Sequence, residues 1–272
     1  MPVSTTASGQ KAWQRRNREE SLIRWAAWMA GTIAFLWCWK QISDATTWFF
    51  VRDAPAIAGD ILERATPPRW SYMDKLWWPI WDTLNIATLG TIGALFLAVP
   101  VAFLAARNTT PSTRLVRPIA LLVIVSTRSI NSLIWALLLI AIIGPGVFAG
   151  VIAIAIRSIG FCAKLLYEAI EEIDRSQVEA ISATGARPMQ VMAYGIVPQI
   201  LPAFAGVAVF RWDINIREST VLGLVGAGGI GLQLQASLNT LAWPQVSLIL
   251  LVILFAVVVS EWVSAKVRGA II

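Results

Sequence analysis

Residues 179–202 read EAISATGARPMQVMAYGIVPQILP and separate two strongly apolar segments of the chain. Gly185 is expected to end a short helix, because glycine costs roughly 1 kcal/mol relative to alanine in a helix interior. Pro188 can then begin a second helical turn, since a proline in the first turn forgoes no helical hydrogen bond. Charged residues crowd the interval 168–187, which overlaps the start of this stretch, and indicate that water surrounds it: Glu168, Glu171, Glu172, Asp174, Arg175, Glu179 and Arg187.

The spacing Glu–x5–Gly–x12–Pro in this stretch resembles the EAA loop of ABC-importer permeases. In that family the loop, here about residues 174–198, forms a cytoplasmic coupling helix that docks in a groove on the ATP-hydrolysing subunit. Two positions depart from the family's pattern, because Ile181 replaces an alanine and Gly195 replaces a branched apolar residue. The alternative is an ordinary loop between two membrane helices. The resemblance implies that four residues couple this chain to an ATPase: Glu179, Ala180, Gly185 and Pro198.

The composition is that of a membrane protein, with 57% hydrophobic residues, 14% charged residues and a mean hydropathy of +0.67. The net charge of +6 fits basic cytoplasmic loops and does not call for nucleic acid as a partner. The chain has no histidine, and Cys38 and Cys162 lie in separate apolar segments. We therefore expect neither a metal site nor a disulfide.

Six apolar spans are expected, each near the roughly 20 residues that a bilayer requires. Pro100 is expected to kink the second span, and Gly144-Pro145-Gly146 marks the turn after the third. The near-neutral, tryptophan-rich residues 40–78 are expected to form an outer loop along the membrane surface. The spans are residues 22–39, 79–106, 118–144, 148–170, 198–224 and 243–265.

The short basic segments decide the expected orientation. If the N-terminus is inside, the basic tail, the Arg107–Arg117 loop, the 179–202 stretch and the basic C-terminus are all cytoplasmic, as the positive-inside rule requires. Both termini are therefore expected in the cytoplasm. The polar N-terminus lacks an early apolar core, so no removable signal peptide is expected. We divide the chain into residues 1–74, which hold the tail, first span and outer loop, and a transmembrane core of residues 75–270.

A glycine-rich stretch, VGAGGIG at residues 225–231, formally matches the GxGxxG pattern of dinucleotide-binding loops. Such a loop needs a strand before it and an acidic residue about 20 positions later. Here the later positions are Leu, Val and Ile inside an apolar span, so we reject a nucleotide site. The stretch is similar to the outer connection before the final helix of methionine- and phosphonate-type permeases.

Polar residues at membrane depth are rare and usually face a partner helix or a water-filled path. Arg128, Asn131, Ser132 and Trp135 follow i, i+3, i+4, i+7 spacing on the third span, and the later spans repeat such faces. Arg211 is expected to matter most, since about 13 residues (~20 Å) after Pro198 it lies near the membrane midplane. The expected substrate pathway is Arg128, Asn131, Arg157, Lys164, Arg211, Asn215 and Arg217.

These cations have a purely structural alternative, in which Asp213 pairs with Arg217 and the side chains of Arg128 and Lys164 reach the interface. The five cations at membrane depth are Arg128, Arg157, Lys164, Arg211 and Arg217. Against the structural alternative, the sequence suggests that four of these five have no acid at the same depth. An anionic substrate would balance that charge.

Three further segments resemble the permease of phosphonate-type ABC importers: RSIN at 128–131, KLLYEAIEEI at 164–173 and RWDINIRESTVLGLVGAGGIG at 211–231. The resemblance covers roughly residues 75–270. It implies an all-α integral membrane protein with the type I ABC-importer permease fold, located in the bacterial inner membrane. It also implies a second permease subunit as partner, forming a homodimer or heterodimer, with two ATP-binding subunits and a periplasmic substrate-binding protein. The cargo would be a phosphonate, phosphite or related phosphorus oxyanion.

Two rival functions remain open. A membrane-embedded enzyme would need acid–base or metal residues at depth, and assay of the purified chain alone would reveal it. A permease for another solute, such as methionine, would be separated by the ligand preference of its binding protein. No catalytic residue is expected here, because the chain lacks a GxxxxGK[ST] phosphate loop; ATP and Mg would bind the partner ATPase subunits.

Overall fold

The computed structural model describes residues 3–5, 9, 11–13 and 18–271, which divide into two compact units, residues 1–62 and 63–272. In the first unit, β1 (Val3–Thr5) pairs antiparallel with β2 (Lys11–Trp13), and α1 (Arg18–Ala45) contains the first expected span. The side chains along α1 are mostly exposed and apolar, as in a helix that lies in lipid. The expected outer loop is itself helical, since α2 (Trp48–Ala65) begins three residues after α1 ends.

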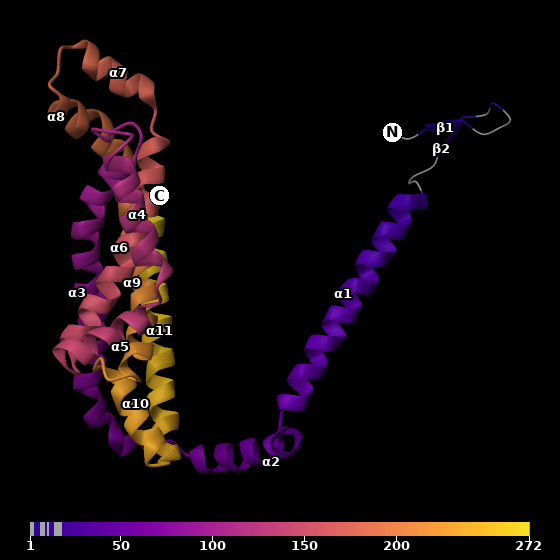
Figure 1. The fold of residues 1–272 in the computed structure, drawn as a ribbon. Helices are drawn as coiled ribbons and strands as arrows, with labels where there is room; N and C mark the ends of the chain where they lie inside the picture. Colours follow the sequence, from indigo (N-terminus) through magenta and orange to yellow (C-terminus); the bar gives the residue numbers. More distant parts are fainter. Residues whose placement is uncertain (1–2, 6–8, 10, 14–17, 272) are drawn as a thin grey trace. The chain divides into compact units, whose positions relative to one another are not determined.

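The second unit is a bundle of four long helices: α3 (Met73–Ala105), α6 (Val147–Glu171), α9 (Val197–Gly223) and α11 (Trp243–Ile271) (Figure 1). Small residues bring α3 and α6 together. A Cβ added to Gly90 would lie 2.7 Å from Ile154 Cγ2, so the two backbones approach too closely for a larger residue. Small residues at helix contacts are typical of membrane bundles, because dispersion between close backbones holds the helices together.

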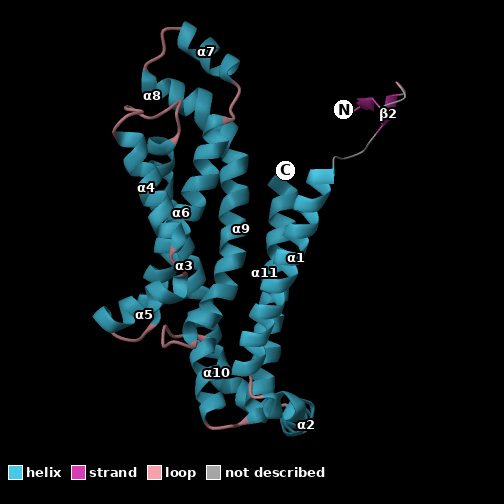
Figure 2. Ribbon diagram, turned by 45° about the vertical axis from the view of Figure 1, so that its right-hand side comes forward, coloured by secondary structure: helices cyan, strands magenta, loops and turns pink. Residues whose placement is uncertain are grey.

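The third expected span is wrong as a single straight helix. It is broken into α4 (Val116–Ser129) and α5 (Ser132–Ile143), whose axes differ by 88°, so that α5 points away from the bundle (Figure 2). Ile130 is extended, and the side chain of Asn131 caps α5 by accepting a hydrogen bond from Leu133 N at 3.1 Å. Asparagine favours this N-cap position, which ends α4 and starts a new helix. The expected common face of Arg128, Asn131, Ser132 and Trp135 is therefore wrong as well.

Within the described residues, five helices are long and apolar enough to cross a membrane, and the α4–α5 pair adds a sixth if it counts as one span. The other expected spans agree with helices to within a few residues at most ends. The sequence did not predict α10 (Ile230–Asn239), which follows the glycine-rich loop. Gly229 has φ +73° and lies against Thr83 of α3, whose hydroxyl accepts a hydrogen bond from Ile230 N at 2.8 Å. Close packing against α3 explains the glycine at position 229.

The 179–202 stretch folds as expected into two short helices at one end of the bundle (Figure 1). α7 (Arg175–Ala183) ends before Gly185, which has φ +79°, and Pro188 is the first residue of α8 (Pro188–Val191). A short π-helical segment, η2 (Met192–Ile196), then leads into α9. The 106–116 connection lies at the same end, because Arg107 N donates to Glu171 Oε1 at the end of α6 at 2.9 Å.

Candidate functional site

Arg211 lies in the interior of the bundle on α9, where only 2% of its surface is exposed. Its Nε donates to Ser158 Oγ of α6 at 2.8 Å, and its Nη2 lies 3.2 Å from Glu218 Oε2. The guanidinium also stands over the Phe161 ring, 5.2 Å from the ring centroid. A buried charge is tolerated where it is paired and hydrogen-bonded, and Arg211 satisfies both conditions.

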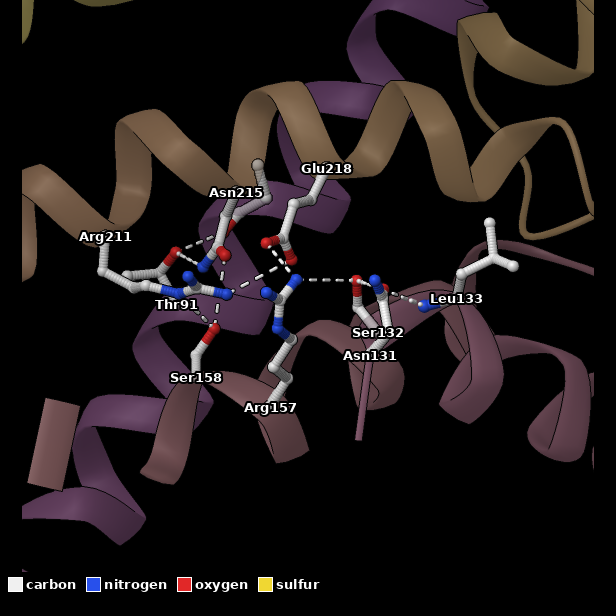
Figure 3. Close-up of polar contacts among 10 residues, drawn as sticks. Thr91, Asn131, Ser132, Leu133, Arg157, Ser158, Arg211, Asn215 and Glu218 are labelled. Atoms are coloured by element: carbon white, nitrogen blue, oxygen red, sulfur yellow. Dashed lines mark hydrogen bonds and ion pairs between the residues drawn. The ribbon is translucent and has the colours of Figure 1, made fainter. Parts of the chain in front are cut away.

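Arg157 of α6 reaches the same carboxylate from the other side. Its Nη1 lies 2.5 Å from Glu218 Oε1 and also donates to Ser132 Oγ of α5 at 3.3 Å (Figure 3). In contrast to Arg211, the side chain of Arg157 is 30% exposed. Glu218 therefore bridges one enclosed arginine and one accessible arginine.

A chain of neutral hydrogen bonds supports Arg211 on its other side. Ser158 Oγ donates to Asn215 Oδ1 at 3.2 Å, and Asn215 Nδ2 donates to Thr91 Oγ1 of α3 at 2.7 Å (Figure 3). These contacts confirm that Arg211 and Asn215 share one face of α9. They join α3, α6 and α9 at one level, and such fully satisfied networks fix the positions of buried side chains.

The remaining expected pathway cations lie elsewhere. Arg217 pairs with Asp213, which also accepts a hydrogen bond from Ser260 of α11 at 2.8 Å. Lys164 lies 3.6 Å from Glu168 on its own helix, and Arg128 is exposed at the last turn of α4. The expected charge imbalance is therefore wrong in detail, because four of the five cations have an acidic partner: Arg157, Lys164, Arg211 and Arg217.

An open recess of about 870 Å³ borders this network between α5, α6 and α9. Of the expected pathway residues it brings Asn131, Arg157 and Arg217 together, whereas Arg128 and Lys164 are not part of its lining. Arg211 and Asn215 lie behind it, in the interior. The polar part of the lining consists of Asn131, Ser132, Arg157, Arg217 and Glu218.

Sequence reasoning missed three members of this network: Glu218, Ser158 and Thr91. Glu218 had a usable signal, because it follows Arg211 by seven residues and so shares its helix face. Ser158 and Thr91 had none, since serine and threonine are common in membrane helices and their hydroxyls often bond their own backbone. Ser158 and Thr91 are recognised as members of the network only from their hydrogen bonds to residues of α9.

The segment Asp174–Gln199, here called the coupling segment, is fastened to the bundle at both ends. The Asp174 side chain caps α7 by accepting from Ser176 N and Ser176 Oγ at 2.9 and 2.7 Å, and these hydrogen bonds lower the pKa of its carboxyl. Gln199 of α9 accepts from Asp174 N at 2.9 Å and donates to Gly195 O at 2.7 Å. Glu179, Ala180, Gly185 and Pro198 are all exposed on this segment.

Gly195 is buried where α7 crosses η2. A Cβ added there would lie 3.4 Å from Ile181 Cδ1 and 3.5 Å from Val178 Cα. The two departures from the EAA pattern, Ile181 and Gly195, are therefore neighbours in space. The Ile181 side chain, larger than the usual alanine, lies in the space that a side chain at position 195 would otherwise occupy.

Comparison with known proteins agrees with this architecture. Residues 98–267 match a family model described as "Binding-protein-dependent transport system inner membrane component". The chain is 40% identical over 237 residues to the phosphite transport system permease protein PtxC of Stutzerimonas stutzeri, covering 87% of this chain and 85% of that protein. It is 34% identical over 206 residues to the putative phosphite transport system permease protein HtxC of the same organism, covering 76% and 73%.

A solved inward-facing structure of the MetNI methionine ABC transporter shares the fold, with a TM-score of 0.65 at 21% identity over 75% of this chain and 99% of that chain. The fold is thus that of type I ABC-importer permeases. Members of the family work with ATPase and binding-protein partners and are not themselves catalytic. The chain belongs to the binding-protein-dependent transport system inner membrane components, and it is the multi-pass permease of an ABC importer.

Proposed function

We propose that this permease moves a phosphorus oxyanion, such as a phosphonate or phosphite, from the periplasm to the cytoplasm. The observation that carries the proposal is Arg157, a partly exposed guanidinium in the lining of a large open recess between α5, α6 and α9. Arginine suits tetrahedral oxyanions, because its planar fork donates paired hydrogen bonds. Two relatives whose names specify phosphite transport add independent support.

The recess is open on one side, which fits a pathway completed by a second permease subunit. A second copy of this chain would present its own Arg157 across the same space and double the positive charge there. The assembled importer would then contain two permeases, two ATP-binding subunits and one periplasmic binding protein. Residues 75–270 would form the permease core, with residues 1–74 adding the N-terminal helix and outer connection.

The coupling segment would contact the ATPase subunits from the cytoplasmic side. In this proposal Glu179 and Ala180 dock on the ATPase, Gly185 permits the turn between α7 and α8, and Pro198 begins the return into the membrane. The exposure of all four residues fits a surface that a partner covers. Both termini would be cytoplasmic, since the basic connections lie at the end of the bundle that carries this segment.

Methionine is the alternative cargo. The methionine transporter structure shares only the fold with this chain, at 21% identity, so it does not argue for methionine as substrate. A zwitterion would also leave the net positive charge of the Arg157–Glu218–Arg211 cluster unbalanced.

Calorimetry on the cognate periplasmic binding protein separates the two cargoes. Phosphite, methylphosphonate, phosphate and methionine would each be titrated into the purified binding protein. Saturable heat with phosphite or methylphosphonate, and none with methionine, is expected. Saturable binding of methionine alone would refute the oxyanion proposal and support the alternative.

A further inference from the structure

We propose that Glu218 is a resident anion, which occupies Arg157 until the transported oxyanion takes its place on that guanidinium. The inference rests on the proposed function, because it requires an oxyanion to enter the recess. It also explains why the bound oxyanion would be released, because the Glu218 carboxylate competes with the substrate for Arg157.

The geometry of Glu218 is that of a substitute for an oxyanion. Its two oxygens pair with different guanidinium groups, Oε1 with Arg157 at 2.5 Å and Oε2 with Arg211 at 3.2 Å. Two arginines and one glutamate leave a net charge of +1 on this cluster. An entering oxyanion would neutralise that excess, so the cluster attracts an anion even while Glu218 is in place.

The two arginines differ in their freedom to move. The Arg211 side chain is 3% exposed and is held by Ser158 and the Phe161 ring, whereas the Arg157 side chain is 30% exposed and lines the recess. Arg157 also keeps a second contact, with the Ser132 hydroxyl. Arg157 is thus the member of the cluster that can turn toward a substrate.

This asymmetry permits exchange without an unpaired buried charge. Removing the partner of a buried ion is strongly destabilising, because the remaining charge lies in a medium that solvates it poorly. When Arg157 turns to an oxyanion in the recess, Glu218 still has Arg211. When the oxyanion leaves, Arg157 returns to Glu218. Passage requires binding that is favourable enough for entry and weak enough for exit, and this competition supplies the weakness.

A purely structural role for Glu218 is the rival explanation. In that case Glu218 only neutralises the buried Arg211, and its removal lowers stability without changing anion affinity. A single Glu218→Gln variant does not separate the two explanations, because it also raises the net charge beside the recess. The double variant Arg211→Gln/Glu218→Gln does separate them: it removes the competing carboxylate and keeps the net charge of the wild type.

The experiment measures equilibrium binding of radiolabelled inorganic phosphite to the purified transporter complex, without its binding protein. Wild type, the double variant, the single Glu218→Gln variant and Asp82→Asn are compared, with thermal unfolding as a check on folding. Asp82→Asn is the matched control, since it converts an acid to its amide on α3, outside the recess lining. Uptake of phosphite and methylphosphonate is measured with the same complexes in proteoliposomes, after the periplasmic binding protein has been added.

The double variant is expected to bind phosphite at least about ten-fold more tightly than wild type, the effect of losing one charged hydrogen-bonding competitor. Its maximal uptake rate should fall, because the substrate leaves more slowly, while Asp82→Asn behaves as wild type. Unchanged phosphite affinity in a folded double variant would overturn the inference and leave the proposed function intact. A wild-type complex that carries neither phosphite nor methylphosphonate would overturn both.

Discussion

At the scale of single residues, surroundings rather than residue type distinguish the arginines of the bundle. Arg157 and Arg211 share one carboxylate, but Arg211 is enclosed by α6 and α9 while Arg157 borders the recess. Arg217 is held by Asp213 on its own helix. Arg157 is therefore the proposed substrate contact, and Arg211 is the arginine that holds Glu218.

Arg211→Gln is expected to reduce uptake by about ten-fold or more, while assembly and basal ATP hydrolysis survive. Without Arg211, Glu218 has Arg157 as its remaining arginine partner, and breaking that pair costs more than in wild type. Transport in proteoliposomes and membrane abundance are the measurements. If Arg211→Gln and Arg128→Gln both transported at wild-type rates, the cations would be structural.

The sequence indicates several members of this cluster, because charged residues stand out in apolar segments. It does not indicate how they pair. Arg157 of α6 reaches Glu218 of α9 because the two helices pack with a particular axial offset. Hydropathy carries no information on that offset. Helix periodicity correctly places Arg211 and Asn215, four residues apart, on one face of α9, where both contact Ser158. It does not extend across Asn131, where one helix ends and the next begins.

At the scale of elements, the coupling segment is a pair of short helices fastened to the end of α9 by one glutamine. Gln199 bonds the Asp174 backbone at the start of the segment and the Gly195 carbonyl near its end. These hydrogen bonds tie the start of the coupling segment to α9, the helix that carries Arg211 and Glu218. The spacing of the EAA motif predicts this segment because a turn with positive φ favours glycine and the first turn of a helix accepts proline.

Glu179→Lys and Gly185→Leu should leave membrane insertion intact and abolish substrate-stimulated ATP hydrolysis by the assembled complex. The first reverses a charge on the exposed face of α7; the second forces a branched side chain into a backbone with φ +79°. Gly206→Ala is the matched control, because a Cβ there meets open space within a helix. Wild-type stimulation in both test variants would remove the coupling role, and low membrane abundance would indicate misfolding instead.

The break between α4 and α5 shows where hydropathy is insufficient. Residues 118–144 are strongly apolar on both sides of a polar patch at 126–132, and their mean hydropathy predicts one span. The signal for a break was Asn131 followed by Ser132 and an apolar run, a sequence typical of a helix N-cap. A hydropathy average over about 20 residues hides a signal of this length. In the structure, the capping hydrogen bond from Leu133 N to Asn131 sets where α5 begins.

At the scale of the whole molecule, the connections between the helices of the second unit lie at two opposite ends of the bundle. Arg107 in the connection after α3 and Arg117 in the first turn of α4 both contact Glu171 Oε1, at 2.9 and 3.5 Å. The basic connection is therefore tied to the end of α6 that leads into the coupling segment. The glycine-rich loop and α10 lie at the opposite end (Figure 1). This separation supports the proposed orientation, with the basic end in the cytoplasm.

Cysteines introduced at Ser4 and at Asp60 test that orientation in intact cells with a membrane-impermeant thiol reagent. Labelling is expected at position 60 and not at position 4, because α1 would carry the chain across the membrane between them. Permeabilised cells, in which both positions should react, are the control. Labelling at position 4 but not at 60 would reverse the topology.

The most direct test of the account is ATP-driven phosphite uptake by proteoliposomes that contain the complete importer. Wild type and Arg114→Gln, a charge change on the exposed 106–116 connection, should accumulate phosphite at similar rates. Arg157→Gln should lower the rate by about ten-fold or more, the scale of one charged hydrogen bond to the oxyanion. Phosphite uptake by Arg157→Gln at the wild-type rate, in vesicles with equal amounts of assembled complex, would contradict the account.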